Sequence, residues 1–333
     1  MLSNKTERQQ INYVPFRLPW EDEQFTRARE LLNKELTQGV TMESLPQRLK
    51  DMYRRERAML PGDDEFENRH INYTDVLRGY YFLVDYFQSL DSGEKFLAGL
   101  KDHNLLASAL SRQVVGFGGK QKWTDPMDIA ATLFYGIAKD HAFHDGNKRI
   151  ALLMLLKSLL KANRVVDCSP KEFEQLTVAV AANDLLETYG KIYRQFLKSN
   201  DPEVMFISNF IRKKTRKLET QYRAITFREL KSVLQKHACD IDDPYHNSIS
   251  VYQSREVSAW LGFKKRTERV KVGTIGFPSW TKQVSEKDIS HVRKVTGLTK
   301  ENGIDSIVFY GGGEPVYKLI EQVEKPLIRL KDK

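Results

Sequence analysis

The most restrictive feature of this chain is a run of seven apolar residues, Ile150–Leu156, within a longer segment of helical character, Lys148–Asn163. A surface helix is apolar along one stripe, whereas this one would be apolar on every face. The run therefore predicts a helix in the middle of a bundle. Lys157 and Ser158 interrupt it, so it falls short of the roughly 18 to 20 apolar residues that a membrane span needs.

The composition and the N-terminal sequence agree with a globular protein. Hydrophobic residues make up 41% of the 333 residues and charged residues 29%, as in globular proteins and unlike disordered chains. The N-terminus contains no apolar run of the length that a signal peptide needs. We expect a cytoplasmic protein with no membrane partner and, from its length, two domains.

Apolar residues at helical spacing predict many helices before residue 223. Between two of them, Val114–Lys120 has the pattern of a β-strand that ends in a glycine turn. Asp125 followed by Pro126, and the capping-box pattern Ser169–Glu172, mark helix starts. This part is expected to be all-α apart from one small hairpin. The predicted helices, besides the apolar one, are Glu21–Gln38, Leu45–Met59, Tyr73–Leu90, Leu105–Gln113, Met127–Lys139, Glu172–Ala182, Leu185–Leu197 and Pro202–Tyr222.

The pattern changes further along the chain. Thr226–Glu229 has the pattern of a capping box that opens a helix to about His237, and Asp288–Thr296 predicts a second helix. Alternating residues predict strands at Ser248–Tyr252, Arg269–Ile275 and Ile304–Tyr310. We therefore expect a mainly α protein, a helical bundle with a small β-hairpin, followed by a small α+β domain. The predicted divisions are an N-terminal helical extension (1–69), a central domain (70–198), a helical connector (199–222) and a C-terminal domain (223–333).

Polar residues gather directly before the apolar helix. A helix N-terminus presents unpaired N–H groups and the positive end of a dipole, so it suits an anion. Gly146 allows a ligand to approach closely, and Lys148 and Arg149 add charge for phosphate. Asp145 can bind Mg²⁺, and His141 can act as a base near neutral pH. The pattern predicts a phosphate site with a base at its edge, an arrangement suited to transfer chemistry.

Three other chemistries have weaker support. His141 and His144 form a conceivable zinc pair, but the HExxH arrangement and further ligands are missing. Gly116–Lys120 lacks the spacing of the P-loop. Cys168 and Cys239 are the only cysteines, lie far apart and have no metal-ligand company, so we expect two idle thiols.

The spacing of these polar residues resembles the signature of the Fic/Doc (Fido) family, here His141-x-Phe143-x-Asp145-Gly146-Asn147-Lys148-Arg149. Leu105–Arg112 and Ala130–Lys139 resemble its death-on-curing (Doc) branch, and the resemblance covers about residues 70–195. It implies a helical fold in which His141 deprotonates a protein hydroxyl, while Asp145 binds the Mg²⁺ of ATP or another nucleoside triphosphate. Phe143 would anchor the loop in the core. The nucleotide-binding residues that the resemblance implies are Gly146, Asn147, Lys148 and Arg149, with Arg149 also catalytic.

The resemblance also implies how a target is held and controlled. A target peptide would pair by β-augmentation with an edge strand, the flap, made of Val114, Val115, Gly116, Phe117 and Gly118. No stretch fully matches the self-inhibiting motif that many Fic enzymes carry. We therefore expect a toxin or regulatory transferase that is controlled by a separate antitoxin, with a translation factor as one conceivable target.

Three positions bear on which group is transferred. Lys148 stands where AMP-transferring Fic enzymes have a second glycine, and in the Doc branch a lysine there goes with donation of the γ-phosphate. Ala142 replaces a proline common in Fic enzymes, which the Doc branch often tolerates. Gly146 is the Fic choice, because Doc sequences often have alanine. We favour phosphorylation, and AMP transfer is the alternative.

The C-terminal part carries most of the net charge of +9: residues 201–333 contain 25 Lys and Arg against 17 Asp and Glu. A basic face with aromatic residues suggests nucleic-acid binding, although a solvated face and a core are the alternatives. The residues concerned are His246, Lys264, Lys265, Arg266, Arg269 and Lys271, interleaved with Tyr252, Trp260, Phe263 and Trp280.

Residues of about 224–300 faintly resemble HicA-type toxins, which have a fold like a double-stranded RNA-binding domain. His246 would match the catalytic histidine of those RNases, but Pro244 and Tyr245 replace the usual Gly-Ser before it. Two further alternatives to a transferase therefore remain open. One is an RNase acting through His246, and the other is a nucleic-acid-binding regulator with an inactive Fic domain.

Overall fold

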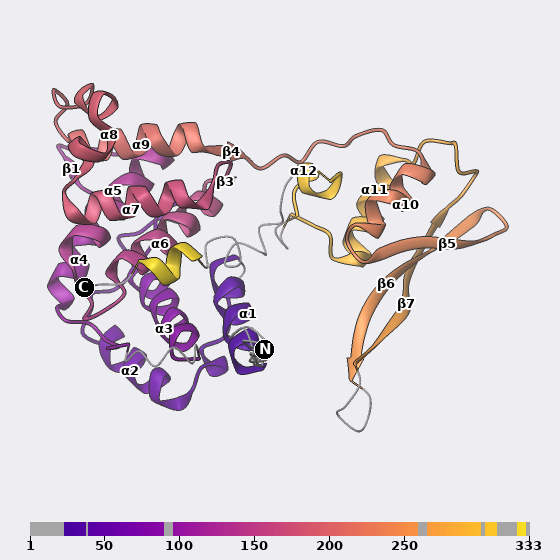
Figure 1. Ribbon diagram of the computed structural model, residues 1–333, viewed down its shortest axis with the longest axis horizontal. Coiled ribbons are helices and arrows are strands. Elements are labelled where there is room, and N and C mark those ends of the chain that lie inside the picture. The colour runs from indigo at the N-terminus through magenta and orange to yellow at the C-terminus, as the bar shows by residue number, and fades with distance from the viewer. Residues whose placement is uncertain are drawn as a thin grey trace, which may run out of the picture.

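A computed structural model describes residues 23–37, 39–89, 96–258, 265–300, 304–311 and 325–330. The chain forms a helical lobe, residues 23–217 with 325–330, and an α+β lobe, residues 218–311 (Figure 1). The helical lobe contains α1 (Glu23–Thr37), the 3-10 helix η2 (Met42–Ser44), α2 (Gln47–Arg57), α3 (Tyr73–Ser89), α4 (His103–Ser111), β1 (Gly116–Phe117), β2 (Lys120–Gln121), α5 (Pro126–Asp140), α6 (Asn147–Lys161), β3 (Arg164–Val166), α7 (Pro170–Ala182), α8 (Leu185–Arg194), α9 (Pro202–Lys214) and β4 (Thr215–Lys217). The α+β lobe contains α10 (Phe227–Gln235), β5 (Cys239–Tyr245), β6 (Ser248–Ser258), β7 (Lys265–Gly276), α11 (Glu286–Thr296) and α12 (Ser306–Phe309).

Helix α6 is the centre of the helical lobe. Every residue from Asn147 to Leu159 except Lys148 is buried, and α5, α3, α7 and α1 all contact this helix. The prediction of a central apolar helix is therefore confirmed. The expected helices before residue 200 are also present, with ends that shift by a few residues. No described helix is long and apolar enough to cross a membrane.

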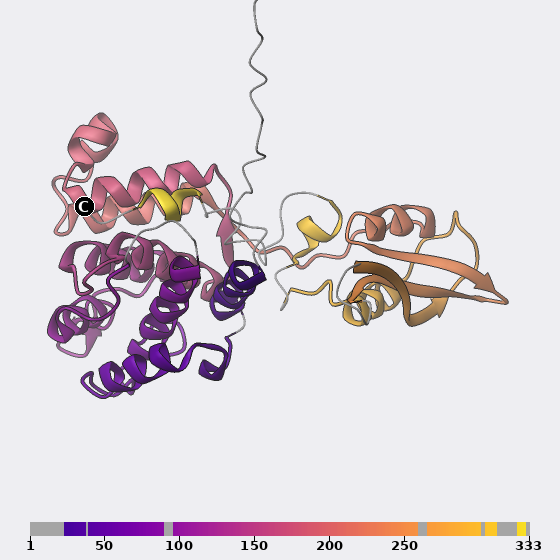
Figure 2. The same ribbon diagram turned by 60° about the horizontal axis from the view of Figure 1, so that its bottom comes forward.

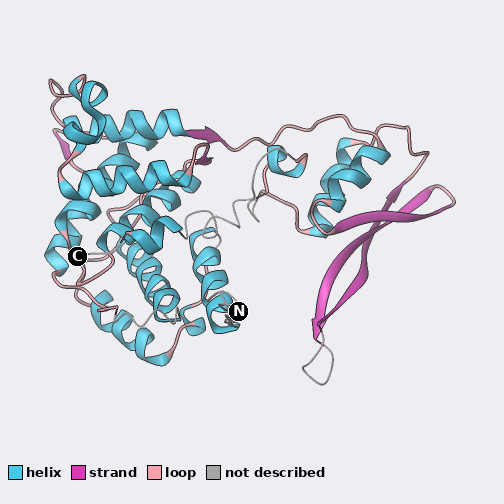
Figure 3. Ribbon diagram, in the orientation of Figure 1, coloured by secondary structure: helices cyan, strands magenta, loops and turns pink. Residues whose placement is uncertain are grey.

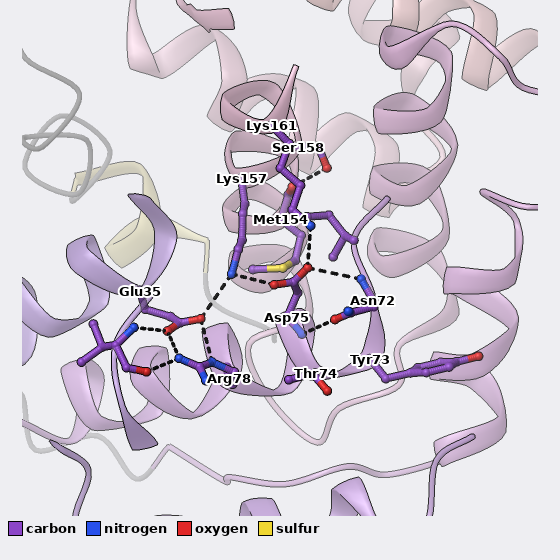
Figure 4. Close-up of polar contacts among 12 residues, drawn as sticks. Glu35, Asn72, Tyr73, Thr74, Asp75, Arg78, Met154, Lys157, Ser158 and Lys161 are labelled. Carbon is purple, nitrogen blue, oxygen red and sulfur yellow. Dashed lines mark hydrogen bonds and ion pairs between the residues drawn. The ribbon is translucent and has the colours of Figure 1, made fainter. Parts of the chain in front are cut away.

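A chain of ion pairs, buried at Glu35 and Lys157, fastens α1 to the central helices (Figure 4). Glu35 of α1 is 1% exposed and accepts two hydrogen bonds from the Arg78 guanidinium, at 3.1 and 2.7 Å. It also pairs with Lys157 of α6 at 3.2 Å. Lys157 lies 3.0 Å from Asp75, which in turn pairs with Lys161 at 2.9 Å. Five alternating charges thus join α1, α3 and α6.

Two predictions for residues 164–222 are wrong. The helix expected over Pro202–Tyr222 ends at Lys214, and β4 follows it and pairs antiparallel with β3, so the helical lobe contains a second small sheet. The capping box at Ser169 does not form: Ser169 precedes α7 without a side-chain cap, and the Glu172 carboxylate pairs with Lys214. A competing ion pair thus takes the carboxylate that the cap needed.

The α+β lobe packs two helices on one three-stranded antiparallel sheet of order β5-β6-β7 (Figure 3). Its core is a separate cluster, with Phe227 and Leu230 of α10, Ile249 and Val251 of β6, and Val292 of α11. The capping box of Thr226 and Glu229 forms as predicted. Strand β5 was not expected from the sequence.

The strand expected over Ile304–Tyr310 is instead helix α12. Asp305 begins it by accepting a hydrogen bond from the N–H of Val308, and Arg216 of β4 pairs with the same carboxylate at 2.6 Å. A buried cap and the ion pair of the buried Asp305 carboxylate thus overcome the alternation of the sequence.

The last described segment returns to the helical lobe, where it lies against that lobe in both views (Figures 1 and 2). Leu327 and Leu330 belong to the same core cluster as α6. Arg329 holds the segment to Glu174 of α7, with its Nε 2.6 Å from the carboxylate. The predicted division at 223–333 did not include this return.

Candidate active site

The polar motif forms the loop between α5 and α6. His141 ends α5 in the left-handed conformation with φ 49°, and Gly146 precedes α6 with φ 86°. Two left-handed residues reverse the chain between the helices. The loop therefore presents the exposed His141 at one end and the N-terminus of α6 at the other.

The inner side of this loop is closed by Phe143 and Asn147. Phe143 is 1% exposed, and its N–H donates to Asn147 Oδ1 at 2.9 Å. The Asn147 amide donates back to the Phe143 oxygen at 2.8 Å. The Phe143 ring stacks on Tyr80 of α3, with centroids 4.0 Å apart. Thus the Asn147 side chain, expected to hold a nucleotide, fixes the loop.

Tyr80 also supports the loop with its hydroxyl. The hydroxyl accepts a hydrogen bond from the N–H of Gly99 at 3.1 Å and donates one to the main-chain oxygen of Asp145 at 3.1 Å. The sequence pattern does not single out this residue, because it lies among apolar residues of a predicted helix.

A second segment, residues 99–102, runs along the motif loop. Leu100 and Phe143 form an isolated antiparallel bridge, and the N–H of Lys101 donates to the Ala142 oxygen at 2.8 Å. The N–H of His144 donates to the Gly99 oxygen at 3.1 Å. The loop is therefore held by main-chain hydrogen bonds to an extended segment as well as by the helix behind it.

Arg149 points into the protein. It is 3% exposed, and its Nε donates to the main-chain oxygen of Leu327 at 2.9 Å. The guanidinium carbon lies 4.1 Å from the centroid of the Phe87 ring and 5.6 Å from that of Phe96. The side chain expected to hold phosphate is thus enclosed by aromatic rings and the C-terminal segment.

Asp145 of the loop forms an ion pair with this buried arginine. Its carboxylate is 3.9 Å from Arg149 Nη1, and 23% of its side chain is exposed. No group of three or more His, Cys, Asp or Glu residues in the described parts of the chain is arranged to hold a metal ion. Any Mg²⁺ here would have Asp145 as its carboxylate and would depend on phosphate and water for other ligands.

A cavity of about 340 Å³ opens beside the loop, which lies within the range of small-molecule sites. Its apolar lining comes from Val178, Ala181 and Ala182 of α7 together with Phe143. The rest of the lining is polar, and neither Asp145 nor Arg149 belongs to it. The polar lining residues are Lys101, His141, His144, Asn147 and Lys148.

Residues 71–159 match the model of the Fic/DOC family. This match contains α3, α4, the β1–β2 hairpin, α5, the motif loop and most of α6. Helices α1 and α2, helices α7 to α9 and the α+β lobe lie outside it. No curated protein and no solved structure matches the chain.

The predicted flap lies within the Fic/DOC segment as the short hairpin β1–β2. Gly116 pairs with Gln121, and Phe117 pairs with Lys120. A side chain at Gly116 would place its Cβ 2.7 Å from the main-chain oxygen of Lys120, so the close pairing needs glycine. Phe117 is 94% exposed and Val115 is 48% exposed. The hairpin thus presents apolar side chains to solvent, as a peptide-binding edge would.

The residues predicted to bind nucleic acid are only partly brought together. Arg269 lies over the Tyr252 ring at 3.9 Å and pairs with Asp240 and Asp242 at 3.4 and 3.2 Å. Lys271 is exposed on β7, and His246 lies in the turn between β5 and β6 with φ 49°.

The rest of this set falls elsewhere. Trp280 packs on Phe277, with ring centroids 4.9 Å apart, and lies partly buried against the lobe's core. Trp260, Phe263 and Lys264 lie outside the described residues. Lys265 and Arg266 begin β7, but their side chains are not described.

Proposed function

We propose that this chain is a Fic-type transferase that uses a magnesium-bound nucleoside triphosphate, with ATP as the first choice, to modify a hydroxyl side chain of a target protein. The observation that carries the proposal is one cavity lined by both His141 and Lys148 at the N-terminus of α6. A family match over residues 71–159 supports the same reading.

His141 is the proposed base. It is exposed, ends α5 in the left-handed conformation and lines the cavity. An imidazole accepts a proton near neutral pH and can therefore activate a hydroxyl. The hydroxyl oxygen would attack a phosphorus atom while its proton moves to the imidazole.

The phosphates would lie at the N-terminus of α6. The first N–H groups of a helix and its dipole favour an anion, and Lys148 adds a positive charge at the same cavity. Asp145 is the proposed ligand of Mg²⁺, which commonly takes one or two carboxylates and completes its shell with phosphate and water. When bound, the metal would neutralise charge that develops on the phosphates.

We propose that the γ-phosphate is transferred and that ADP is the leaving group. The reason is that Lys148 stands where AMP-transferring Fic enzymes have a second glycine. In the alternative, attack at the α-phosphorus transfers AMP and releases pyrophosphate. We propose further that the protein is a cytoplasmic toxin or regulatory enzyme restrained by a separate antitoxin, and that the exposed flap residue Phe117 contacts the target.

The test is to incubate the purified chain and a cell extract with ATP labelled at either the α or the γ position. Label on protein from the γ position alone supports phosphorylation, and label from the α position supports AMP transfer. His141→Ala should abolish the label that the added chain produces above that of the extract alone, whereas His246→Ala in the α+β lobe should not. Protein modification that survives His141→Ala, or activity that depends on His246 instead, would reject the proposed transferase.

A further inference from the structure

The cavity beside the motif loop contains a cation that the motif does not include. Of the described residues that line it, two are lysines: Lys148, from the motif, and Lys101, from the extended segment 99–102. Arg149, the second cation of the motif near this loop, instead donates to the Leu327 oxygen and lies against Phe87. The positive charge on the cavity wall therefore comes from two different parts of the chain.

Lys101 is fixed relative to the motif loop. Its N–H donates to the Ala142 oxygen at 2.8 Å, and the next N–H, that of Asp102, donates to the same oxygen at 3.1 Å. The preceding residue, Leu100, forms the bridge to Phe143. Thus the main chain of Lys101 is held beside the residues that follow His141, while its side chain is exposed and lines the cavity.

A buried carboxylate from another helix holds this segment. Glu56 of α2 is 6% exposed, accepts the N–H of Leu100 at 3.0 Å and accepts the hydroxyl of Tyr81 at 2.6 Å. A buried carboxylate that lost these donors would be costly, so the pair constrains where Leu100 lies. Helix α2, which supplies this carboxylate, lies outside the segment that matches the family model.

We infer that Lys101 is a second phosphate-binding residue of the cavity, which shares the phosphates with Lys148, and that Glu56 is the positioning residue that keeps Lys101 there. The ligand is the polyphosphate of a nucleotide, and the inference rests on the proposed function. A lysine ammonium acts on phosphate as a point charge at the end of a flexible side chain. A fixed main chain with an exposed side chain is therefore sufficient for Lys101 to bind phosphate.

The first experiment measures the dissociation constants of the full chain for magnesium-ATP and for adenosine, by titration calorimetry. Lys101→Met keeps the length of the side chain and removes its charge. It should weaken ATP binding about five- to tenfold, as expected for one charge-assisted contact near solvent, and leave adenosine binding unchanged. Lys191→Met, on an exposed position of α8, is the matched control and should change neither constant.

Two outcomes of this experiment are separable. If the wild type binds ATP and Lys101→Met binds it equally well, the role of Lys101 is wrong while the proposed function stands. If the wild type binds no nucleotide at all, the proposed function fails and this inference fails with it.

The second experiment tests Glu56 as a positioning residue. Glu56→Ala should weaken ATP binding by about the same factor as Lys101→Met, and the double variant should be no weaker than either one, because both act through the same ammonium group. Glu56→Gln keeps an acceptor for Leu100 and should restore most of the affinity. If Glu56→Ala weakens ATP binding further when Lys101 is already methionine, so that the two losses of binding free energy add, the assignment is overturned.

Discussion

The side chain of Arg149 donates to the main-chain oxygen of Leu327, a residue 178 positions further along the chain. The hydrogen bond joins the first turn of the central helix to the C-terminal segment. Leu327 is itself completely buried in the core of the helical lobe. A motif residue thus serves as a structural anchor.

This relationship predicts that Arg149 contributes to stability. Arg149→Ala removes a hydrogen bond from a charged donor and its packing on Phe87, so the free energy of unfolding should fall by about 2 to 4 kcal/mol. Urea unfolding followed by circular dichroism measures the change. Arg54→Ala, at a side chain that is 60% exposed, is the control and should have little effect. An Arg149→Ala protein as stable as the wild type would contradict the anchoring role.

Gly146 is expected to resist substitution for two separable reasons. A Cβ there would lie 2.8 Å from Cζ of Phe96, and φ is +86°. Gly146→Ala should therefore lower stability by more than the roughly 1 to 2 kcal/mol of a left-handed residue alone. Gly119→Ala provides that reference, because its φ is +76° and nothing lies within 4 Å of the added Cβ.

Thermal unfolding of these two variants separates strain from contact. Combining Gly146→Ala with Phe96→Ala should be less harmful than the sum of the single changes, because the second removes the atom that the new Cβ meets. If Gly146→Ala and Gly119→Ala lowered stability equally, the contact with Phe96 would contribute nothing to the cost of the Gly146 substitution.

The chain of ion pairs around the buried Glu35 predicts that α1 depends on a single carboxylate. Glu35→Ala leaves Arg78 and Lys157 without their common partner in a buried site, so stability should fall by about 3 kcal/mol. The matched control is Glu43→Ala, because Glu43 pairs with Lys50 but is 72% exposed, and this change should be nearly silent. Limited proteolysis should cut the variant first within α1, and a variant that resists protease like the wild type would argue against this role.

The two thiols are expected to react slowly while the protein is folded. Burial raises the pKa of Cys168 to about 12 and that of Cys239 to about 11. Both groups should therefore be almost fully protonated at pH 8, and the thiolate is the reactive form. Alkylation by iodoacetamide at pH 8, followed by mass spectrometry, should be many times slower in buffer than in concentrated urea. Rapid labelling of Cys168 in the folded protein would contradict this.

Much of the helical lobe follows from local sequence patterns. The apolar run at Ile150–Leu156 predicts a central helix, because a helix that is apolar on every face must be buried on all sides. Pro126 after Asp125 marks the start of α5, as observed. Local rules failed where distant partners decide. The Glu172 carboxylate goes to Lys214 and not to a cap, and Asp305 begins a helix where alternation favoured a strand.

The candidate site shows the same division. The spacing of the motif places His141 at the end of α5 and Lys148 in the first turn of α6, and both line the cavity. Lys101 and Glu56 could not be found in this way, because their roles arise only after α2 and the segment 99–102 pack beside the loop. The burial of Arg149 likewise depends on a segment near the C-terminus that no local pattern connects to it.

The last prediction concerns acid stability and the pair of Asp305 with Arg216. Burial by itself would raise the pKa of Asp305, but the hydrogen bonds from Arg216 and from the N–H groups of Val308 and Glu219 lower it below its ordinary value. A carboxylate whose pKa is lowered by folding contributes stability above its unfolded pKa of about 3.9, and this contribution is lost as the pH falls through the lower folded value.

Asp305→Asn keeps the acceptor that begins α12 but removes the charge. The variant should be less stable than the wild type at pH 7, and the difference should shrink as the pH falls from about 5 toward 2, since the wild-type carboxylate then becomes neutral as well. Urea unfolding at several pH values measures this difference, and Asp64→Asn at an exposed position is the control. A gap between wild type and Asp305→Asn that stays constant down to pH 2 would mean that the ion pair with Arg216 does not stabilise the fold.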